Sequence, residues 1–327
     1  IISEHPDWLL RNAKGRPVNC GFGWNALTRA LDLTVPDALE YACRAVGAAV
    51  HRWGYPYLKL DFLYAAAVKG RYNDPTRTRA QVLRGGMQAL RDAAGEDAFL
   101  VGCGAPLGSV IGLVDAMRVG EDGSPDWYPY IFGIGLGIRH EPFLPSVRNS
   151  VHNTLTRSAL HGRWWINDPD CLLVRPNTHL SLAEVQTLAS AIALTGGSLL
   201  VSDNLAELPE ERRRIIEVLL PLIGQRPQVI DLFDGESPSR LRLDLAGPAG
   251  DWHLLARFNW QDIPVEWKFN PHDFRLDRDA YLLRSFWEGV IQEVYPGEEL
   301  EMPALSAHGV CVLALRRRTG GEAQYAG

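Results

Sequence analysis

Short apolar runs alternate with segments of helical period over the first two thirds of the chain. The apolar runs lie at 57–62, 97–104, 114–119, 164–170 and 196–204. Apolar residues at helical spacing predict helices at 36–54, 76–94, 146–160, 181–194 and 208–223, with Pro36 in the first turn of the first one. This alternation predicts parallel strands covered by helices.

Each of the five predicted strands ends in a residue that can take part in chemistry. These residues are Asp61, Cys103, Asp122 just past its strand, Asp168 with Asp170, and Asp203. A doubly wound sheet needs such residues only beside its switch point, whereas a closed barrel gathers every strand end around one axis. We therefore expect residues 1–227 to form a (β/α)8 TIM-type barrel. Only five of its eight strands are present, and since the chain opens on Ile1 rather than Met, the rest are expected before Ile1.

From about residue 228 onward the period of apolar residues changes to two. Strands are predicted at 229–233, 240–245, 253–258 and 310–315, separated by glycine and proline. We expect residues 228–318 to form a small antiparallel β-sandwich domain. Residues 319–327 are expected to be a disordered tail.

Composition narrows the choice of partners. The chain has 327 residues and a net charge of −6, with no basic stripe, which argues against a nucleic-acid partner. No apolar run approaches the roughly 18 to 20 residues of a membrane span, and no basic-then-apolar leader is visible, so a cytoplasmic location is favoured. The five cysteines are scattered and offer no zinc spacing, so neither metal nor cofactor is expected. Oligomerisation stays open.

The most informative pair of residues is Lys59 and Asp61. Residues i and i+2 of a strand point to the same side, so the two side chains should project together from the strand end. The ammonium favours the ionised form of the carboxylate, and a positioned carboxylate can act as a nucleophile. The pair is equally compatible with an ordinary salt bridge.

The other strand ends also have structural interpretations. Arg118 with Asp122 is compatible with an ion pair, and Cys103 with a small buried apolar residue. Asp168-Pro169-Asp170 is compatible with a turn and a helix cap. The pair Asp203-Asn204 is compatible with a cap of the following helix.

Taken in order, the strand-end motifs resemble those of the α-galactosidases of glycoside hydrolase family 36, in the wider melibiase clan. The resemblance covers residues 5–224 and continues more weakly through 286–289. The motifs are K-L-D-F at 59–62, G-C-G-A-P-L-G at 102–108, M-R-V-G-E-D at 117–122, W-I-N-D-P-D at 165–170 and S-D-N at 202–204.

This resemblance implies a role for each matching residue. Asp61 falls on the nucleophile, with Lys59 contacting the sugar, and Asp122 falls on the general acid/base, with Arg118 near the sugar 2-hydroxyl. Retaining glycoside hydrolysis needs two such carboxylates about 5 to 5.5 Å apart. The neighbouring Glu121 is expected to favour the neutral form of Asp122, as an acid requires.

The resemblance implies further residues around the sugar. Cys103 and Gly104 are expected to line the sugar subsite. Trp165, Asp168 and Asp170 are expected to shape the site without taking part in bond cleavage.

The chain departs from the family in one respect. Family members carry an adjacent pair of aspartates on an early strand that holds the galactose 4- and 6-hydroxyls, and no such pair precedes Asp61. Selectivity for galactose therefore does not follow from these residues. Because only five of the eight strands are present, the chain on its own is expected to be inactive or weakly active unless a complementary segment is supplied.

The function expected from the resemblance is a retaining exo-α-galactosidase acting on α-galactoside oligosaccharides of the raffinose or melibiose type. A galactosyltransferase of the raffinose-synthase type and an α-N-acetylgalactosaminidase stay open. From a different class, an inactive carbohydrate-binding fragment also stays open.

Overall fold

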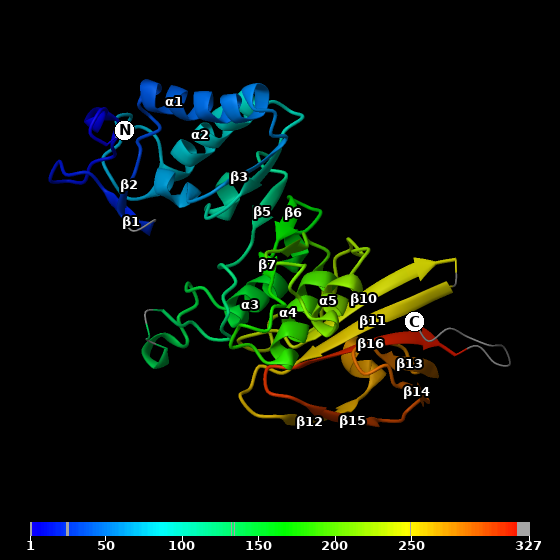
Figure 1. Ribbon diagram of the computed structural model, residues 1–327. Coiled ribbons are helices and arrows are strands. Elements are labelled where there is room, and N and C mark those ends of the chain that lie inside the picture. Colours follow the sequence, from blue (N-terminus) through cyan, green and yellow to red (C-terminus); the bar gives the residue numbers. More distant parts are fainter. Residues whose placement is uncertain (1, 24–25, 132, 134, 249, 319–327) are drawn as a thin grey trace. The chain divides into compact units, whose positions relative to one another are not determined.

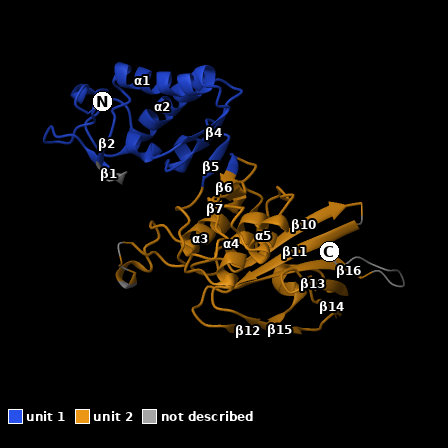
Figure 2. Ribbon diagram, viewed as in Figure 1, with its two compact units in different colours: residues 1–118, 164–166 blue, residues 119–163, 167–327 orange. Residues whose placement is uncertain are grey.

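The computed structural model describes residues 2–23, 26–131, 133, 135–248 and 250–318 (Figure 1). The predicted disordered tail, 319–327, lies outside the described residues. The chain divides into two compact units (Figure 2). Unit 1 comprises Ile1–Arg118 and Trp164–Ile166, and unit 2 comprises Val119–Arg163 and Asn167–Gly327. The predicted domain boundary at 227/228 stays a prediction.

One four-stranded sheet contains four of the strands whose ends carry the predicted site residues. Its order is β3-β4-β5-β6, with β3 at Tyr57–Leu60, β4 at Phe99–Gly102, β5 at Ala116–Arg118 and β6 at Ile166–Asp168. The pairs β3/β4 and β4/β5 are parallel, with Tyr57 opposite Phe99 and Val101 opposite Ala116. Apart from the buried Arg118, the buried side chains of β4 and β5 are apolar, and Leu100, Val101, Ala116 and Met117 are all nearly inaccessible to solvent.

Unit 1 contains two of the predicted helices, of which the first begins at the predicted residue and the second begins at Arg79 rather than at residue 76. Helix α1, Pro36–Gly47, has Val35 at its N-cap and Pro36 at the first helical position, and it continues as a π-helical segment, Ala48–Arg52. Helix α2, Arg79–Ala94, begins with a reciprocal capping box between Thr78 and Gln81.

A β-hairpin in unit 1 was not predicted. Strand β1, Asn19–Gly23, pairs antiparallel with β2, Ala26–Arg29. Cys20 and Ala30 are buried and form a small core with Leu10. The hairpin supplies one wall of the site described below.

Unit 2 begins with three helices and a short pair of strands. The helices are α3, Val147–Thr156, α4, Leu182–Thr195, and α5, Glu210–Glu217, and the parallel strands are β7, Cys171–Leu172, and β8, Leu200–Val201. Short 3-10 helices occur across both units at Pro6–Trp8, Leu63–Ala67, Leu107–Ser109, Leu136–Ile138, Ser158–Leu160 and Pro271–Phe274.

Helix α5 is shorter than the predicted 208–223. After Glu217 the chain tightens, with the N–H of Leu220 donating to the carbonyl of Glu217. Pro221 then blocks continuation, because proline has no N–H to donate and disfavours the helical conformation of the residue before it. The apolar periodicity of this segment therefore overestimated the length of the helix.

The C-terminal part is an antiparallel six-stranded sheet of order β14-β13-β16-β11-β10-β9, with a separate pair β12-β15. The predicted strands at 240–245, 253–258 and 310–315 are confirmed within β10, β11 and β16, whereas only the start of the predicted 229–233 strand lies in a strand. The bounds are β9 Gln228–Val229, β10 Arg240–Gly247, β11 Gly250–Phe258, β12 Val265–Phe269, β13 Tyr281–Ser285, β14 Ile291–Val294, β15 Leu300–Leu305 and β16 Val310–Arg317.

The six-stranded sheet is covered on both faces. One face, with Phe258 and Val312, belongs to the same core as Ile192 of α4. The opposite face, with Leu255 and Leu313, packs in a second core with residues of β12 and β15. Because side chains alternate along each strand, neighbouring residues such as Val312 and Leu313 enter different cores.

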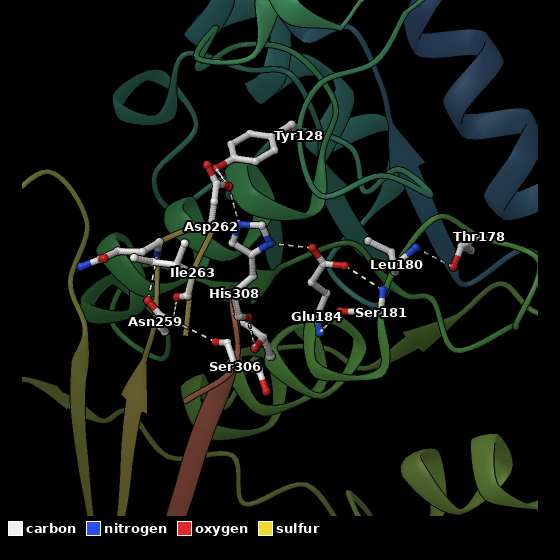
Figure 3. A network of polar contacts seen from close by, with 12 residues as sticks. Tyr128, Thr178, Leu180, Ser181, Glu184, Asn259, Asp262, Ile263, Ser306 and His308 are labelled. Carbon is white, nitrogen blue, oxygen red and sulfur yellow. Dashed lines mark hydrogen bonds and ion pairs between the residues drawn. The ribbon is translucent and has the colours of Figure 1, made fainter. Parts of the chain in front are cut away.

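A polar network ties α4 to the loops of the sheet (Figure 3). Glu184 closes the capping box of α4 by accepting from the N–H of Ser181 at 2.7 Å, and its other oxygen lies 2.7 Å from Nδ1 of His308. Nε2 of His308 lies 2.9 Å from Asp262, which also accepts from the hydroxyl of Tyr128 at 2.8 Å. The His308 ring stacks on Trp127, with ring centroids 4.5 Å apart.

The α/β alternation and the C-terminal antiparallel sheet are confirmed. In the part of the chain that the structure describes, the β3-β4-β5-β6 and β7-β8 sheets stay separate and do not close into a barrel. The number of strands explains this, because a TIM barrel closes with eight. Among the described residues, no helix is both long and apolar enough to cross a membrane.

Candidate active site

Asp61 follows the last residue of β3 and is held by two groups. Its Oδ1 accepts the N–H of Phe62 at 2.7 Å, and its Oδ2 lies 3.9 Å from Nζ of Lys59. Both side chains stay partly exposed, 38% for Lys59 and 42% for Asp61. The prediction that the two project together from the strand end is confirmed.

The backbone turns sharply immediately after Asp61. Phe62 has a φ of 54°, in the left-handed region that costs a non-glycine residue roughly 1–2 kcal/mol. The turn aims the Phe62 N–H back at the Asp61 carboxylate. Left-handed residues of this kind concentrate at functional sites.

Asp61 lines a cavity of about 290 Å³ in unit 1. Cys20, Arg29 and Tyr64 also line it, from the β1/β2 hairpin and the 3-10 helix after Asp61. The hydroxyl of Tyr64 donates to the carbonyl of Cys20 at 2.6 Å, which fastens the hairpin to this wall. The volume is close to the lower end of ligand pockets, roughly 300 Å³.

Cys103 and Gly104 follow β4 and adjoin the same wall. Burial first, and then a hydrogen bond to Asp61, raise the pKa of Cys103 to about 12, so its thiol is protonated at neutral pH. The carbonyl of Gly104 accepts the N–H of Tyr64 at 2.8 Å. Gly104 has a φ of 66°, where a side chain would be strained.

The two other predicted residues of unit 1 are buried. Arg118, the last residue of β5, is 5% exposed. Its positive charge, like that of Lys59, lowers the pKa of the Cys103 thiol and so partly opposes the effect of burial. Trp165 is 4% exposed and makes an edge-to-face contact with Trp164, with centroids 5.6 Å apart. With so little exposed surface, Trp165 presents no open face to solvent, and its expected part in shaping the site stays a prediction.

Asp122 lies in unit 2, exposed on the loop after β5. The next residue, Gly123, donates its N–H to Oδ2 of Asp170 at 2.6 Å. The N–H of Asp170 donates to Oδ1 of Asp168 at 2.9 Å, and the carbonyl of Asp168 accepts the N–H of Val119 at 3.0 Å. Asp168 and Asp170 therefore hold both ends of the short segment that carries Asp122.

The predicted turn at Asp168-Pro169-Asp170 is present, but the helix cap is wrong. The bond from Asp170 N–H to Asp168 is the Asx type, and Asp170 has a φ of 76°. Strand β7 begins at the next residue, so no helix starts there. The carboxylate of Asp170 serves the Gly123 backbone instead.

Glu121 has an opposite charge nearby. The Arg157 guanidinium donates to the carbonyl of Val119, and burial lowers the pKa of Arg157 while the Glu121 carboxylate raises it. The side chain of Arg157 thus connects α3 to the Asp122 segment. The expected effect of Glu121 on the protonation of Asp122 stays a prediction.

Asp203 does not cap the following helix, contrary to expectation. Its fully buried carboxylate accepts the N–H groups of Val174 and Arg175 at 2.6 and 3.0 Å and pairs with the Arg175 guanidinium at 2.7 Å. Helix α5 starts later, after Pro209 at its N-cap. Asp203 therefore orders the chain after β7.

The predicted site residues fall into two groups. Unit 1 holds Lys59, Asp61, Cys103, Gly104, Arg118 and Trp165, and unit 2 holds Asp122, Asp168 and Asp170. Sequence reasoning missed Arg29 and Tyr64 on the cavity wall. Tyr64 lies three residues after Asp61, which was a usable signal, whereas Arg29 reaches the cavity only through the unpredicted hairpin.

Comparison with solved structures finds similar proteins, although no protein-family model matches the chain. An α-galactosidase from Thermus thermophilus is 36% identical over 67% of this chain and 46% of its own, with a TM-score of 0.56, in a complex with stachyose. In a complex with p-nitrophenyl α-D-galactopyranoside, the same enzyme is 34% identical over 74% of this chain, with a TM-score of 0.59. The chain thus spans about half the length of that enzyme.

More distant structures share the fold alone. α-Galactosidase I from Mortierella vinacea is 13% identical over 91% of this chain and 75% of its own, with a TM-score of 0.63. A glycoside hydrolase family 27 β-L-arabinopyranosidase from Geobacillus stearothermophilus is 15% identical over 96% of this chain and 68% of its own, with a TM-score of 0.65. The chain is therefore similar in sequence to one α-galactosidase and in fold to several enzymes of the melibiase clan.

Proposed function

We propose that the protein is a retaining α-galactosidase of the glycoside hydrolase family 36 type, with Asp61 as nucleophile and Asp122 as general acid/base. In this proposal its parallel strands are part of a (β/α)8 barrel. The substrate is an oligosaccharide or glycoside with a terminal α-linked galactose. The similar Thermus thermophilus enzyme, in complexes with stachyose and a nitrophenyl α-galactoside, supports this substrate class.

The observation that carries the proposal is the setting of Asp61. Its carboxylate ends β3, borders a cavity of about 290 Å³, and is fixed by the Phe62 N–H and by Lys59. A positioned carboxylate at the border of an open cavity is suited to attack an anomeric carbon. The protonated Cys103 thiol adds a hydrogen bond to the same group.

The proposed reaction proceeds in two displacements. Asp61 attacks the anomeric carbon and forms a galactosyl ester, while Asp122 gives its proton to the glycosidic oxygen as that bond breaks. Water then attacks the same carbon, Asp122 takes a proton from it, and the ester bond to Asp61 breaks. Two inversions at one carbon leave the product with the anomeric configuration of the substrate.

The test replaces Asp61 with asparagine in the natural full-length protein and measures hydrolysis of p-nitrophenyl α-galactoside. Turnover is expected to fall by about three orders of magnitude or more, because the covalent path is lost while the sugar still binds. Asp97→Asn, an exposed carboxylate just before β4, is the matched control and should leave turnover intact. Unchanged turnover in Asp61→Asn would overturn the nucleophile assignment.

Chemical rescue tests the role itself. Azide is small enough to occupy the space left by Asp61→Gly and to attack the anomeric carbon from the nucleophile's side, which gives a β-galactosyl azide. No azide product, or an α-azide, would contradict the assignment. Product analysis with excess acceptor sugar then separates hydrolysis from galactosyl transfer.

A further inference from the structure

A second cavity lies entirely within unit 2. It measures about 540 Å³ and lies among α4, α5, β11 and the turn after β13. We call it the Trp287 pocket and define it by the residues that matter below: Gln186, Glu211, Arg214, Trp252, Phe286 and Trp287. None of them belongs to the proposed catalytic machinery. The volume falls within the range of roughly 300 to 1,000 Å³ typical of ligand pockets.

The aromatic part of the pocket is fixed in place. The indole N–H of Trp287 donates to the hydroxyl of Ser190 at 3.0 Å, and its ring meets that of Phe286 edge to face with centroids 5.0 Å apart. Trp252 has the Arg316 guanidinium over its ring at 5.1 Å. Phe286 is 40% exposed, so an aromatic surface faces the open side without having to rearrange.

The polar part of the pocket offers donors and acceptors that the rest of the described chain does not use. In the residues that the structure describes, the side chains of Gln186, Glu211 and Arg214 are engaged in no hydrogen bond or ion pair. Glu211 can only accept, Arg214 can only donate, and Gln186 can do both. A ligand rich in hydroxyl groups matches this set, since each hydroxyl both donates and accepts.

The charges of the pocket select against ionic ligands. Glu211 and Glu288 contribute two negative charges, and Arg214 and Arg284 contribute two positive ones. A phosphate would be attracted by the two arginines and repelled by the two glutamates, and a cation would experience the reverse. A neutral ligand can hydrogen-bond to both signs without that cost.

We propose that the Trp287 pocket binds a neutral saccharide, with a pyranose ring stacked on Phe286 and its edge beside Trp287, and its hydroxyls held by Glu211, Arg214 and Gln186. A pyranose has an apolar C–H face and a polar rim, which matches an aromatic platform edged by donors and acceptors. The site acts in binding, not in bond cleavage. Its existence does not depend on the proposed catalytic function.

The experiment follows raffinose binding by hydrogen exchange in the full-length Asp61→Asn protein, which keeps the sugar intact. Raffinose is expected to protect two peptides, residues 210–218 and 285–290, in addition to residues 57–66 at the proposed catalytic cavity. In Arg214→Ala and Phe286→Ala, half-protection of the first two peptides should require about tenfold more raffinose, with residues 57–66 unaffected.

Matched controls come from the same surfaces. Arg213→Ala removes a neighbouring arginine of α5 that pairs with Glu217 outside the pocket, and Phe233→Ala removes an aromatic side chain that is 93% exposed. Both should keep the raffinose response. If raffinose protected residues 210–218 and 285–290 but not residues 57–66, the result would count against the catalytic proposal and would support the pocket proposal.

Two results would overturn the pocket proposal. The first is the absence of raffinose-dependent protection at residues 210–218 and 285–290 while residues 57–66 respond. The second is protection of these peptides without sugar that grows with protein concentration, since it would assign the Phe286 surface to contact with a second copy of the chain.

Discussion

The backbone N–H of Gly123 donates to Oδ2 of Asp170 across 2.6 Å, and this bond fastens the segment of Asp122 to the turn after β6. A hydrogen bond to a carboxylate is shorter and stronger than one between neutral groups. Asp170 therefore acts as a positioning residue for the proposed acid/base. It works through the backbone next to Asp122.

Replacing Asp170 tests this relationship. In Asp170→Ala the Gly123 N–H loses its acceptor, and kcat on a nitrophenyl α-galactoside is expected to fall by about a hundredfold with a smaller change in KM. Asp170→Asn keeps an oxygen and tolerates the φ of 76°, so its loss should be clearly smaller. A shift of the acidic and basic limbs of the pH profile would distinguish positioning from a simple loss of stability. Equal activity of all three proteins would refute the role.

Asp122→Ala should affect substrates according to their leaving groups. A nitrophenolate leaves without a proton, whereas the sugar alkoxide of melibiose requires one, so the loss of kcat/KM should be larger on melibiose by about a hundredfold. The measurement is the ratio of kcat/KM on the two substrates. Glu141→Gln, an exposed carboxylate later in the same connection, is the control. The same loss on both substrates would exclude Asp122 as the acid.

Cys103 is expected to make the folded protein less stable in alkali. Its pKa is about 12 in the folded state against 9.0 in a free thiol, mainly because of burial. Between these values the unfolded chain releases this proton while the folded chain keeps it, so stability falls as pH rises from 9 towards 12. Cys103→Ala should flatten this dependence in urea unfolding followed at several alkaline pH values. An unchanged slope would contradict the buried, protonated thiol.

Glu184 should stabilise the protein in two separable ways. Glu184→Gln keeps a side chain that can close the capping box with Ser181 but removes the charge beside His308, and it should cost about 1–2 kcal/mol of unfolding free energy. Glu184→Ala removes both interactions and should cost about 3 kcal/mol. Chemical denaturation at neutral pH measures both. An equal cost for the two variants would mean that the capping-box bond to Ser181 contributes nothing.

The same residue predicts a dependence on acid. Burial raises the pKa of Glu184, but hydrogen bonds from His308 and Ser181 outweigh it and hold the pKa below the usual 4.5. Its contribution is therefore complete above that value and is lost as pH falls through the lowered pKa. The difference in stability between the wild type and Glu184→Gln should shrink in that range. A difference that stays constant would exclude the linkage.

The sequence was informative wherever local rules set the structure. Pro36 marks a helix start that the structure confirms, and the i, i+2 spacing of Lys59 and Asp61 places both side chains together. The alternation of strands and helices predicted the parallel pairing that β3, β4 and β5 show. These features depend on neighbours in the chain, so a single sequence can reveal them.

The parts that were missed depend on contacts between distant segments. The β1/β2 hairpin contains Gly21 and Gly23, which are atypical of strands, and only its packing beside Tyr64 makes it a wall of the cavity. Strand β15 contains Pro303, which weakened the strand pattern. The carboxylate of Asp170 accepts a hydrogen bond from the backbone N–H of Gly123, which lies 47 residues away in the sequence. No local motif indicates this partner.

The shared core of α4 and the C-terminal sheet has a consequence for how the chain can be divided. Leu188 and Ile192 of α4 share one hydrophobic core with Phe258 and Val312 of the sheet. Dividing the chain before β9 would therefore expose an apolar surface on each of the two fragments. Each fragment would tend to aggregate, either with identical fragments or with the other fragment. The helices of unit 2 and the C-terminal sheet should therefore be expressed and engineered together, as a single polypeptide.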